Sequence, residues 1–88
     1  MHSIKFSEHA YLKLDILKSH GILLTIEVVQ DAIANPDKIE EGYKGRMIAQ
    51  KGLDTSHVVR VVYEKHGEEI KVITFYPGRR ERYDKDKI

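Results

Sequence analysis

Apolar residues recur at helical spacing between Glu8 and His20, and this periodicity predicts the first helix of the chain. Ser7 is a suitable N-cap residue in front of it, and Gly21 behind it can adopt the left-handed conformation that ends many helices. A second, shorter helix is predicted after Thr25, where a helical stripe of apolar residues follows: Ile26, Val29 and Ile33. It ends at Asn35-Pro36, because the residue before a proline is disfavoured in the helical region.

Beyond Pro36 the apolar period changes from about 3.6 to 2, the period of β-strands. This pattern predicts four strands, over Lys38–Tyr43, Arg46–Leu53, His57–Lys65 and Glu69–Tyr76. The expected fold is therefore α+β, with two N-terminal helices packed on one face of a four-stranded antiparallel sheet. Ile4-Lys5-Phe6 is only a short apolar lead-in in this scheme. The chain divides into one domain over residues 1–83 and a charged C-terminal tail over residues 84–88.

Length and composition narrow the class of protein. Eighty-eight residues make one small domain, and 41% hydrophobic with 33% charged residues is typical of a folded globular chain. The longest apolar runs, such as Ile22-Leu23-Leu24, are too short for a transmembrane helix or a signal-peptide core. We therefore expect a cytoplasmic protein without membrane association. The absence of cysteine excludes disulfides and thiolate chemistry and suits a reducing compartment.

The charge is unevenly distributed along the chain. From Met1 to Tyr43, four lysines stand against seven acidic residues, whereas from Lys44 to Ile88 eleven lysines and arginines stand against seven acidic residues. All five arginines lie in this second half. A basic half in a chain of net charge +1 indicates a surface that faces a polyanion.

The spacing of histidines and carboxylates does not match a metal site. His9 and His20 share a helix face but lie roughly 16 Å apart along the helix axis. None of the five histidines falls at the spacing of a zinc motif, so we expect no metal and no other cofactor. The acidic pairs Glu40-Glu41 and Glu68-Glu69 fall at predicted strand ends, where solvated charges are expected.

His9 and Lys13 lie side by side on the first predicted helix, because residues at i and i+4 are neighbours on a helix surface. Two interpretations remain open for them. In the first, Lys13 extends along the edge of the core while His9 hydrogen-bonds a backbone carbonyl. In the second, this ridge borders a groove and helps to bind an anion.

The largest group of candidate functional residues is basic. Lys44, Arg46, Lys51 and Arg60 fall on or between adjacent predicted strands, and the C-terminal segment adds Arg79-Arg80-Glu81-Arg82-Tyr83. Arg60 is unusual because valines flank it in mid-strand, where desolvating a fixed charge is unfavourable without a partner. It either pairs with Glu64 or another acid on the open sheet face, or it binds phosphate. Arginines beside a tyrosine suit phosphate binding and base stacking, respectively.

Short motifs along nearly the whole chain occur in a characteristic order: His9-Ala10, Gly21-Ile22, the segment Val28–Ile33 followed by Asn35-Pro36-Asp37, Gly45-Arg46, Ala49-Gln50-Lys51, Leu53, Arg60-Val61-Val62-Tyr63-Glu64, Ile70-Lys71-Val72-Ile73-Thr74, Tyr76-Pro77 and Arg82-Tyr83. In this order and spacing, the chain resembles domain of unknown function 4258. This small prokaryotic family is usually grouped with the RelE/ParE-like toxin superfamily.

The resemblance implies two N-terminal helices on an antiparallel sheet and a role as the toxin of a toxin–antitoxin pair. RelE-type members are metal-free ribonucleases that cut mRNA, often on the ribosome, so the implied partners are RNA or the ribosome and an acidic antitoxin. By position, Arg60 corresponds to the mid-strand arginine of the family pattern and Arg82-Tyr83 to its basic-aromatic C-terminus. Lys44, Arg46 and Lys51 would be supporting phosphate contacts, together with Arg79 and Arg80.

Metal-free RNA cleavage needs a base for the 2′-hydroxyl proton, a cation over the phosphate and a group that assists the leaving oxygen. Under this hypothesis Arg60 is the cation and Arg82 an auxiliary cation. Tyr83 stacks on a base or hydrogen-bonds near the scissile bond, and Lys51 or His9 is the base. The alternatives are a non-catalytic module that binds a nucleic acid or a protein, and a ParE-like inhibitor of gyrase.

Overall fold

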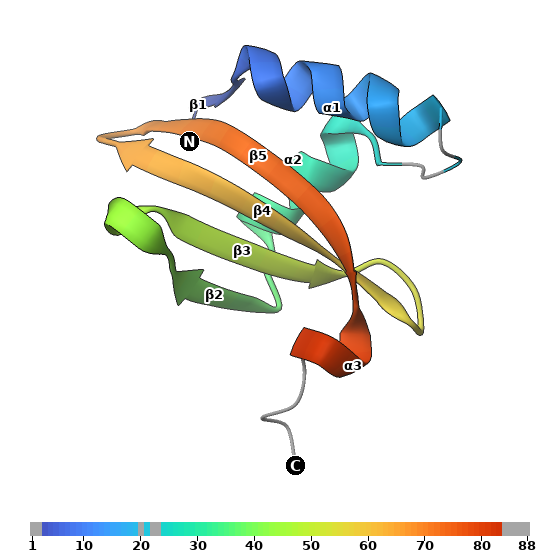
Figure 1. Cartoon of the computed structure of the whole chain (residues 1–88). Helices are drawn as coiled ribbons and strands as arrows, with labels where there is room; N and C mark the ends of the chain where they lie inside the picture. Colours follow the sequence, from blue (N-terminus) through green and yellow to red (C-terminus); the bar gives the residue numbers. More distant parts are fainter. Residues whose placement is uncertain (1–2, 20, 22–23, 84–88) are drawn as a thin grey trace.

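The computed structural model describes residues 3–19, 21 and 24–83 of the chain (Figure 1). Its elements follow in the order β1 (Ser3–Phe6), α1 (Glu8–Ser19), α2 (Ile26–Ala34), β2 (Lys38–Glu41), a 3-10 turn (Tyr43–Gly45), β3 (Met47–Gly52), β4 (His57–His66), β5 (Glu69–Arg79) and α3 (Arg80–Tyr83). The predicted α+β class, both predicted helices and the change to strands after Pro36 are confirmed. Within the described ranges, no helix is long and apolar enough to cross a membrane.

The sheet has five strands in the order β1-β5-β4-β3-β2 and is mixed, because β1 runs parallel to β5 while the other neighbours are antiparallel. The four predicted strands are present and antiparallel to one another, but the sheet is not the predicted four-stranded antiparallel sheet, because β1 adds a fifth, parallel strand. The predicted lead-in is itself the edge strand, pairing from Ser3 with Glu69 to Phe6 with Val72. Four residues are too few to show a strand period in the sequence.

Strand β5 extends to Arg79, beyond the predicted end at Tyr76, and Pro77 pairs with Val59 inside it. Proline lacks an N–H donor and is tolerated in sheets mainly at an edge. The pairing of β1 with β5 stops at Val72, so within the described part of the chain the outer edge of β5 has no strand beside it at Pro77. Helix α1 packs against β5 instead.

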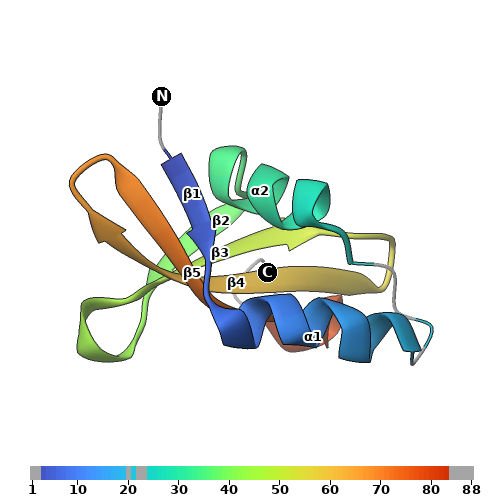
Figure 2. The same cartoon turned by 90° about the horizontal axis from the view of Figure 1, so that it is seen from above.

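The main core lies between the two helices and one face of the sheet. Figure 2 shows α1 along β5 and α2 across from it, beside β3 and β4; α1 packs on β5, and α2 packs on β3 and β4. Both helices and the strands β4 and β5 contribute fully buried residues to this core: Ala10, Val29, Ala32, Val59, Val61, Val72 and Phe75. Residues of both helices therefore belong to one core, and α1 lies at β5, near the edge of the sheet.

Ser7 connects the start of α1 to the sheet. Its Oγ accepts a hydrogen bond from the Ala10 amide at 3.1 Å, which caps the helix, and donates to the Ile73 carbonyl at 3.0 Å. Ile73 is the additional residue in β5 where the β4–β5 register shifts, so the cap fixes α1 at an irregular point of the strand.

We expect Ser7→Ala to lower the free energy of unfolding by about 1–2 kcal/mol, because it removes a helix cap and a hydrogen bond to a carbonyl. Urea denaturation followed by circular dichroism measures this change. Ser19→Ala is the matched control, since among the residues that the structure describes the Ser19 hydroxyl bonds to the Ile16 carbonyl alone, at the exposed end of the same helix. Equal losses in the two variants would contradict the proposed connection.

Candidate functional site on the outer sheet face

Polar side chains form a row across the face of the sheet opposite α2, which we call the outer face. The register aligns Lys38, Gln50, Arg60 and Tyr76 on four neighbouring strands. These positions alternate with core residues such as Val59 and Val61, because successive side chains of a strand point to opposite faces. The row therefore places the predicted mid-strand arginine at the centre of the outer face.

Arg60 is held by three neighbours. Its Nη2 donates to Glu40 Oε2 at 2.6 Å, its Nη1 to Gln50 Oε1 at 2.5 Å and its Nε to Tyr76 Oη at 3.1 Å. The arginine side chain is only 7% exposed. Of the two interpretations of Arg60, the structure agrees with pairing to an acidic residue, and that residue is Glu40. Its rigid guanidinium can orient its neighbours.

Glu40 is an exception to the expected solvated strand-end acids. Its carboxylate also lies 3.5 Å from Lys38 Nζ, and the side chain is partly buried. The hydrogen bond from Arg60 holds the pKa of the Glu40 carboxyl below its ordinary value, and the charge of Lys38 acts in the same direction. Glu40 is therefore ionised at neutral pH and balances part of the positive charge on the outer face.

Lys13 reaches the same face from α1. Its Nζ donates to Thr74 Oγ1 at 3.3 Å and lies 5.7 Å from the centroid of the Tyr76 ring. Burial lowers the pKa of the Lys13 ammonium group. An amine, a phenol and a guanidinium thus follow one another as the Lys13–Tyr76–Arg60 cluster. Lys13 extends along the edge of the core, as one of the two interpretations expects, and its amine reaches the polar residues of the outer face.

His9 precedes Lys13 by one helical turn and is exposed. It makes no hydrogen bond with any residue that the structure describes, so the expected bond to a backbone carbonyl is not present. Its spacing places the imidazole on the same side of α1 as the Lys13 amine. Its role as a base stays a prediction.

Lys51 lies on the opposite side of the sheet from Arg60. Strand alternation places it with Ala49 on the helix side, where its Nζ contacts the Asn35 carbonyl at 2.8 Å and Asp31 Oδ2 at 3.6 Å. It therefore binds the C-terminal end of α2. Lys51 therefore does not join Arg60 in one phosphate-binding surface, because its position in β3 has the opposite parity to Gln50.

The remaining basic candidates lie at the two ends of the sheet. At one end, Lys44 Nζ lies 5.5 Å from the Tyr43 ring centroid and Arg46 Nε lies 3.1 Å from Glu64 Oε2. At the other end, Arg79 closes β5 and Arg80 begins α3. Arg82 and Tyr83 belong to α3, but their side chains lie outside the described part of the structure, as do His20 and the predicted tail over residues 84–88.

Sequence reasoning missed Glu40, Gln50 and Tyr76 as members of this site. The period of 2 does assign Gln50, Arg60 and Tyr76 to one face, but it contains no information on which residues of neighbouring strands are opposite each other. Within the described residues, no group of three or more histidines and carboxylates could hold a metal ion. The outer face offers acid–base groups and cations of its own.

Comparisons of the chain with protein-family models, with curated proteins and with solved structures found no match.

Proposed function

We propose that the protein is a toxin-like, metal-independent endoribonuclease whose reaction takes place at the Lys13–Tyr76–Arg60 cluster. The observation that carries this proposal is the contact between a partly buried amine and a phenol that is itself held by a guanidinium. Acid–base groups at such distances can act on one bound phosphodiester. The resemblance of the sequence to RelE/ParE-like toxins supports RNA as the substrate.

In this mechanism, neutral Lys13 takes the proton of a ribose 2′-hydroxyl, whose oxygen then attacks the adjacent phosphorus. The bond from phosphorus to the 5′-oxygen breaks, and the leaving oxygen takes the proton of Tyr76. The products are a 2′,3′-cyclic phosphate and a 5′-hydroxyl, and water returns the proton from Lys13 to Tyr76. The lowered pKa of Lys13 increases its neutral fraction at neutral pH.

Arg60 is a positioning residue in this proposal. Its Nε donates to Tyr76 Oη, so a lone pair of the phenol is occupied and the phenolic proton points away from Arg60. Glu40 and Gln50 fix the other side of the guanidinium. In this arrangement the mid-strand arginine contributes to the reaction by orienting Tyr76, without contacting the substrate itself.

The proposed biological context is a toxin–antitoxin pair. An acidic antitoxin would neutralise the toxin by covering the outer face, where Lys13 and Lys38 flank the cluster. The resemblance implies ribosome-bound mRNA as the substrate. Binding to the ribosome would also supply the affinity for RNA that a chain of net charge +1 lacks.

The test is an RNA cleavage assay with the purified full chain in a chelator, alone and with translating ribosomes. We expect RNA to be cut to products with 2′,3′-cyclic phosphate ends, while a DNA strand of the same sequence stays intact because it lacks the 2′-hydroxyl. Intact RNA under both conditions would overturn the proposal. Growth arrest on expression with intact cellular RNA would instead favour a gyrase inhibitor.

A further inference from the structure

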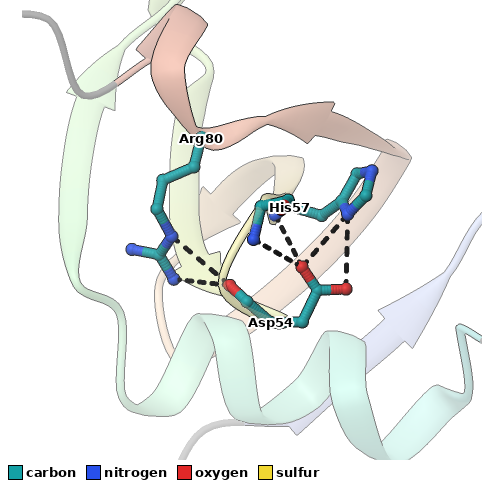
Figure 3. Close-up of polar contacts among 4 residues, drawn as sticks. Asp54, His57 and Arg80 are labelled. Carbon is teal, nitrogen blue, oxygen red and sulfur yellow. Dashed lines mark hydrogen bonds and ion pairs between the residues drawn. The ribbon is translucent and has the colours of Figure 1, made fainter.

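A second polar site lies at the end of the sheet where the loop between β3 and β4 meets the end of β5 (Figure 3). The Asp54 carboxylate accepts hydrogen bonds from the Ser56 and His57 amides, each at 2.8 Å, and lies 3.1 Å from His57 Nδ1. These bonds hold the imidazole at Nδ1 and leave Nε2 directed away from the carboxylate. The turn therefore presents one oriented imidazole nitrogen to the surface.

Two arginines border this histidine. Arg79 is the register partner of His57 across β4 and β5, is exposed, and its side chain forms no hydrogen bond or ion pair within the described residues. The Arg80 guanidinium donates to the Asp54 carbonyl, at 3.0 Å from Nη2 and 3.3 Å from Nε, and thereby fixes the loop. Arg79 thus stands beside His57 as a cation that no described side chain neutralises.

Two adjoining surface hollows share His57 and Arg79 in their walls. One, of about 600 Å³, is also lined by the polar residues Thr55, Ser56, Arg80 and Glu81. The other, of about 680 Å³, has a more apolar wall formed by Val28, Leu53 and Pro77. His57 and Arg79 therefore stand between a hollow lined by polar residues and a hollow that also has the apolar side chains of Val28, Leu53 and Pro77 in its wall.

We propose that this corner binds a nucleotide unit, with one phosphate between His57 Nε2 and Arg79 and with the sugar or base against Val28, Leu53 and Pro77. Arginine binds phosphate oxygens through two parallel donors, and an imidazole N–H adds a third. The carboxylates of Asp54 and Glu81 lie on the same rim as Arg79 and Arg80. This balance favours a single phosphate group over a polyphosphate.

The site is separate from the Lys13–Tyr76–Arg60 cluster, because His57 and Arg79 are three register positions away from Arg60 and Tyr76 and have the opposite parity. The inference does not rest on the proposed ribonuclease activity, since binding is measured without turnover. A nucleotide unit occurs both as a free mononucleotide and within an RNA strand, and the chemistry described serves either.

The experiment is a titration of the ¹⁵N-labelled full chain, followed by amide chemical shifts, with AMP, adenosine, inorganic phosphate and the dinucleoside monophosphate ApA. We expect AMP or ApA to shift amides of residues 54–57 and 78–80, and to bind at least about tenfold more tightly than phosphate or adenosine, because only they contact both walls. Tighter binding of ApA would identify an RNA strand as the source, and tighter binding of AMP a free nucleotide.

Arg79→Gln and His57→Gln should each weaken AMP binding about tenfold, as expected for losing a charge-assisted hydrogen bond. His66→Gln is the matched control, because His66 is another exposed histidine, paired with Glu64 at the opposite end of the sheet. Unchanged spectra away from the substituted residue verify the fold. The proposal is overturned if phosphate binds as tightly as AMP, if the shifts lie elsewhere, or if His66→Gln weakens binding equally.

Discussion

Replacing Lys13 with alanine is expected to slow RNA cleavage by about a hundredfold, the effect typical of losing a general base. Lys13 is the amine whose Nζ reaches Thr74 and the Tyr76 ring, and burial lowers its pKa toward the range in which it can accept a proton. Single-turnover cleavage of a short RNA in a chelator measures the rate. Lys51→Ala is the matched control, since Lys51 lies on the opposite face and contacts α2.

Lys13→Arg distinguishes a base from a simple cation. Arginine keeps the positive charge at this position but does not release its proton at neutral pH. If Lys13 is the base, Lys13→Arg is as slow as Lys13→Ala. If Lys13→Arg retains most of the wild-type rate, or if Lys51→Ala is as slow as Lys13→Ala, Lys13 does not accept the proton.

Replacing Arg60 with methionine is expected to lower the free energy of unfolding by about 2–4 kcal/mol, a large fraction of the stability of a small domain. Gln50 is only 2% exposed, and the change removes the hydrogen bond that its side chain accepts from Arg60. The change also leaves the Glu40 carboxylate beside a new apolar surface. Arg60→Lys should fall between, because lysine keeps the charge and loses the planar fork. Urea denaturation of the variants measures the loss.

A double-mutant cycle with Glu40→Gln provides the control for this prediction. Because Glu40 and Arg60 contact each other directly at 2.6 Å, the double variant should be more stable than the sum of the two single changes indicates. Strictly additive losses would show that the contact does not contribute. Tyr76 should also lose its fixed orientation, so folded Arg60→Lys protein should cleave RNA more slowly than wild type.

Acidification should weaken the fold through the same carboxylate. Arg60 holds the pKa of Glu40 below its ordinary value in the folded chain, so the unfolded chain binds a proton at Glu40 more readily. The ionised group therefore stabilises the fold above its ordinary pKa, and this contribution is lost as the pH falls through the lowered folded pKa. Between about pH 6 and pH 3, wild type should lose more stability than Glu40→Gln. Parallel curves would contradict this assignment.

The fold was predictable where the residues form long periodic segments. Helix α1, the end of α2 at Asn35-Pro36 and the hairpin at Gly67, whose φ is +63°, all follow from local physical rules. The edge strand β1 does not, because its four residues are defined as a strand only by their pairing with β5. The continuation of β5 through Pro77 likewise depends on which edge of that strand is covered.

The sequence predicts which face of the sheet carries Arg60, but it does not predict which residues contact it. Mid-strand parity places Arg60 on the outer face, but Glu40 and Tyr76 contact it only because of the strand register. The same parity argument, applied to β3, would have separated Lys51 from Gln50. To predict that Lys13 belongs to the site, one must know where α1 packs on β5. That position depends on the contact of Ser7 with β5 at the register shift.

The parallel pairing of β1 with β5 also determines when, during folding and synthesis, the N-terminal part of the chain can take its final position. Ser7 bonds to Ile73 across 66 positions of the sequence, and β1 pairs with strand residues at the same separation. Contacts between such distant residues slow folding, so we expect refolding in milliseconds to seconds rather than microseconds. On the ribosome, α1 reaches its final place only after β5 has been synthesised. A nascent chain interrupted before β5 therefore lacks the Lys13–Tyr76 contact and with it the proposed chemistry.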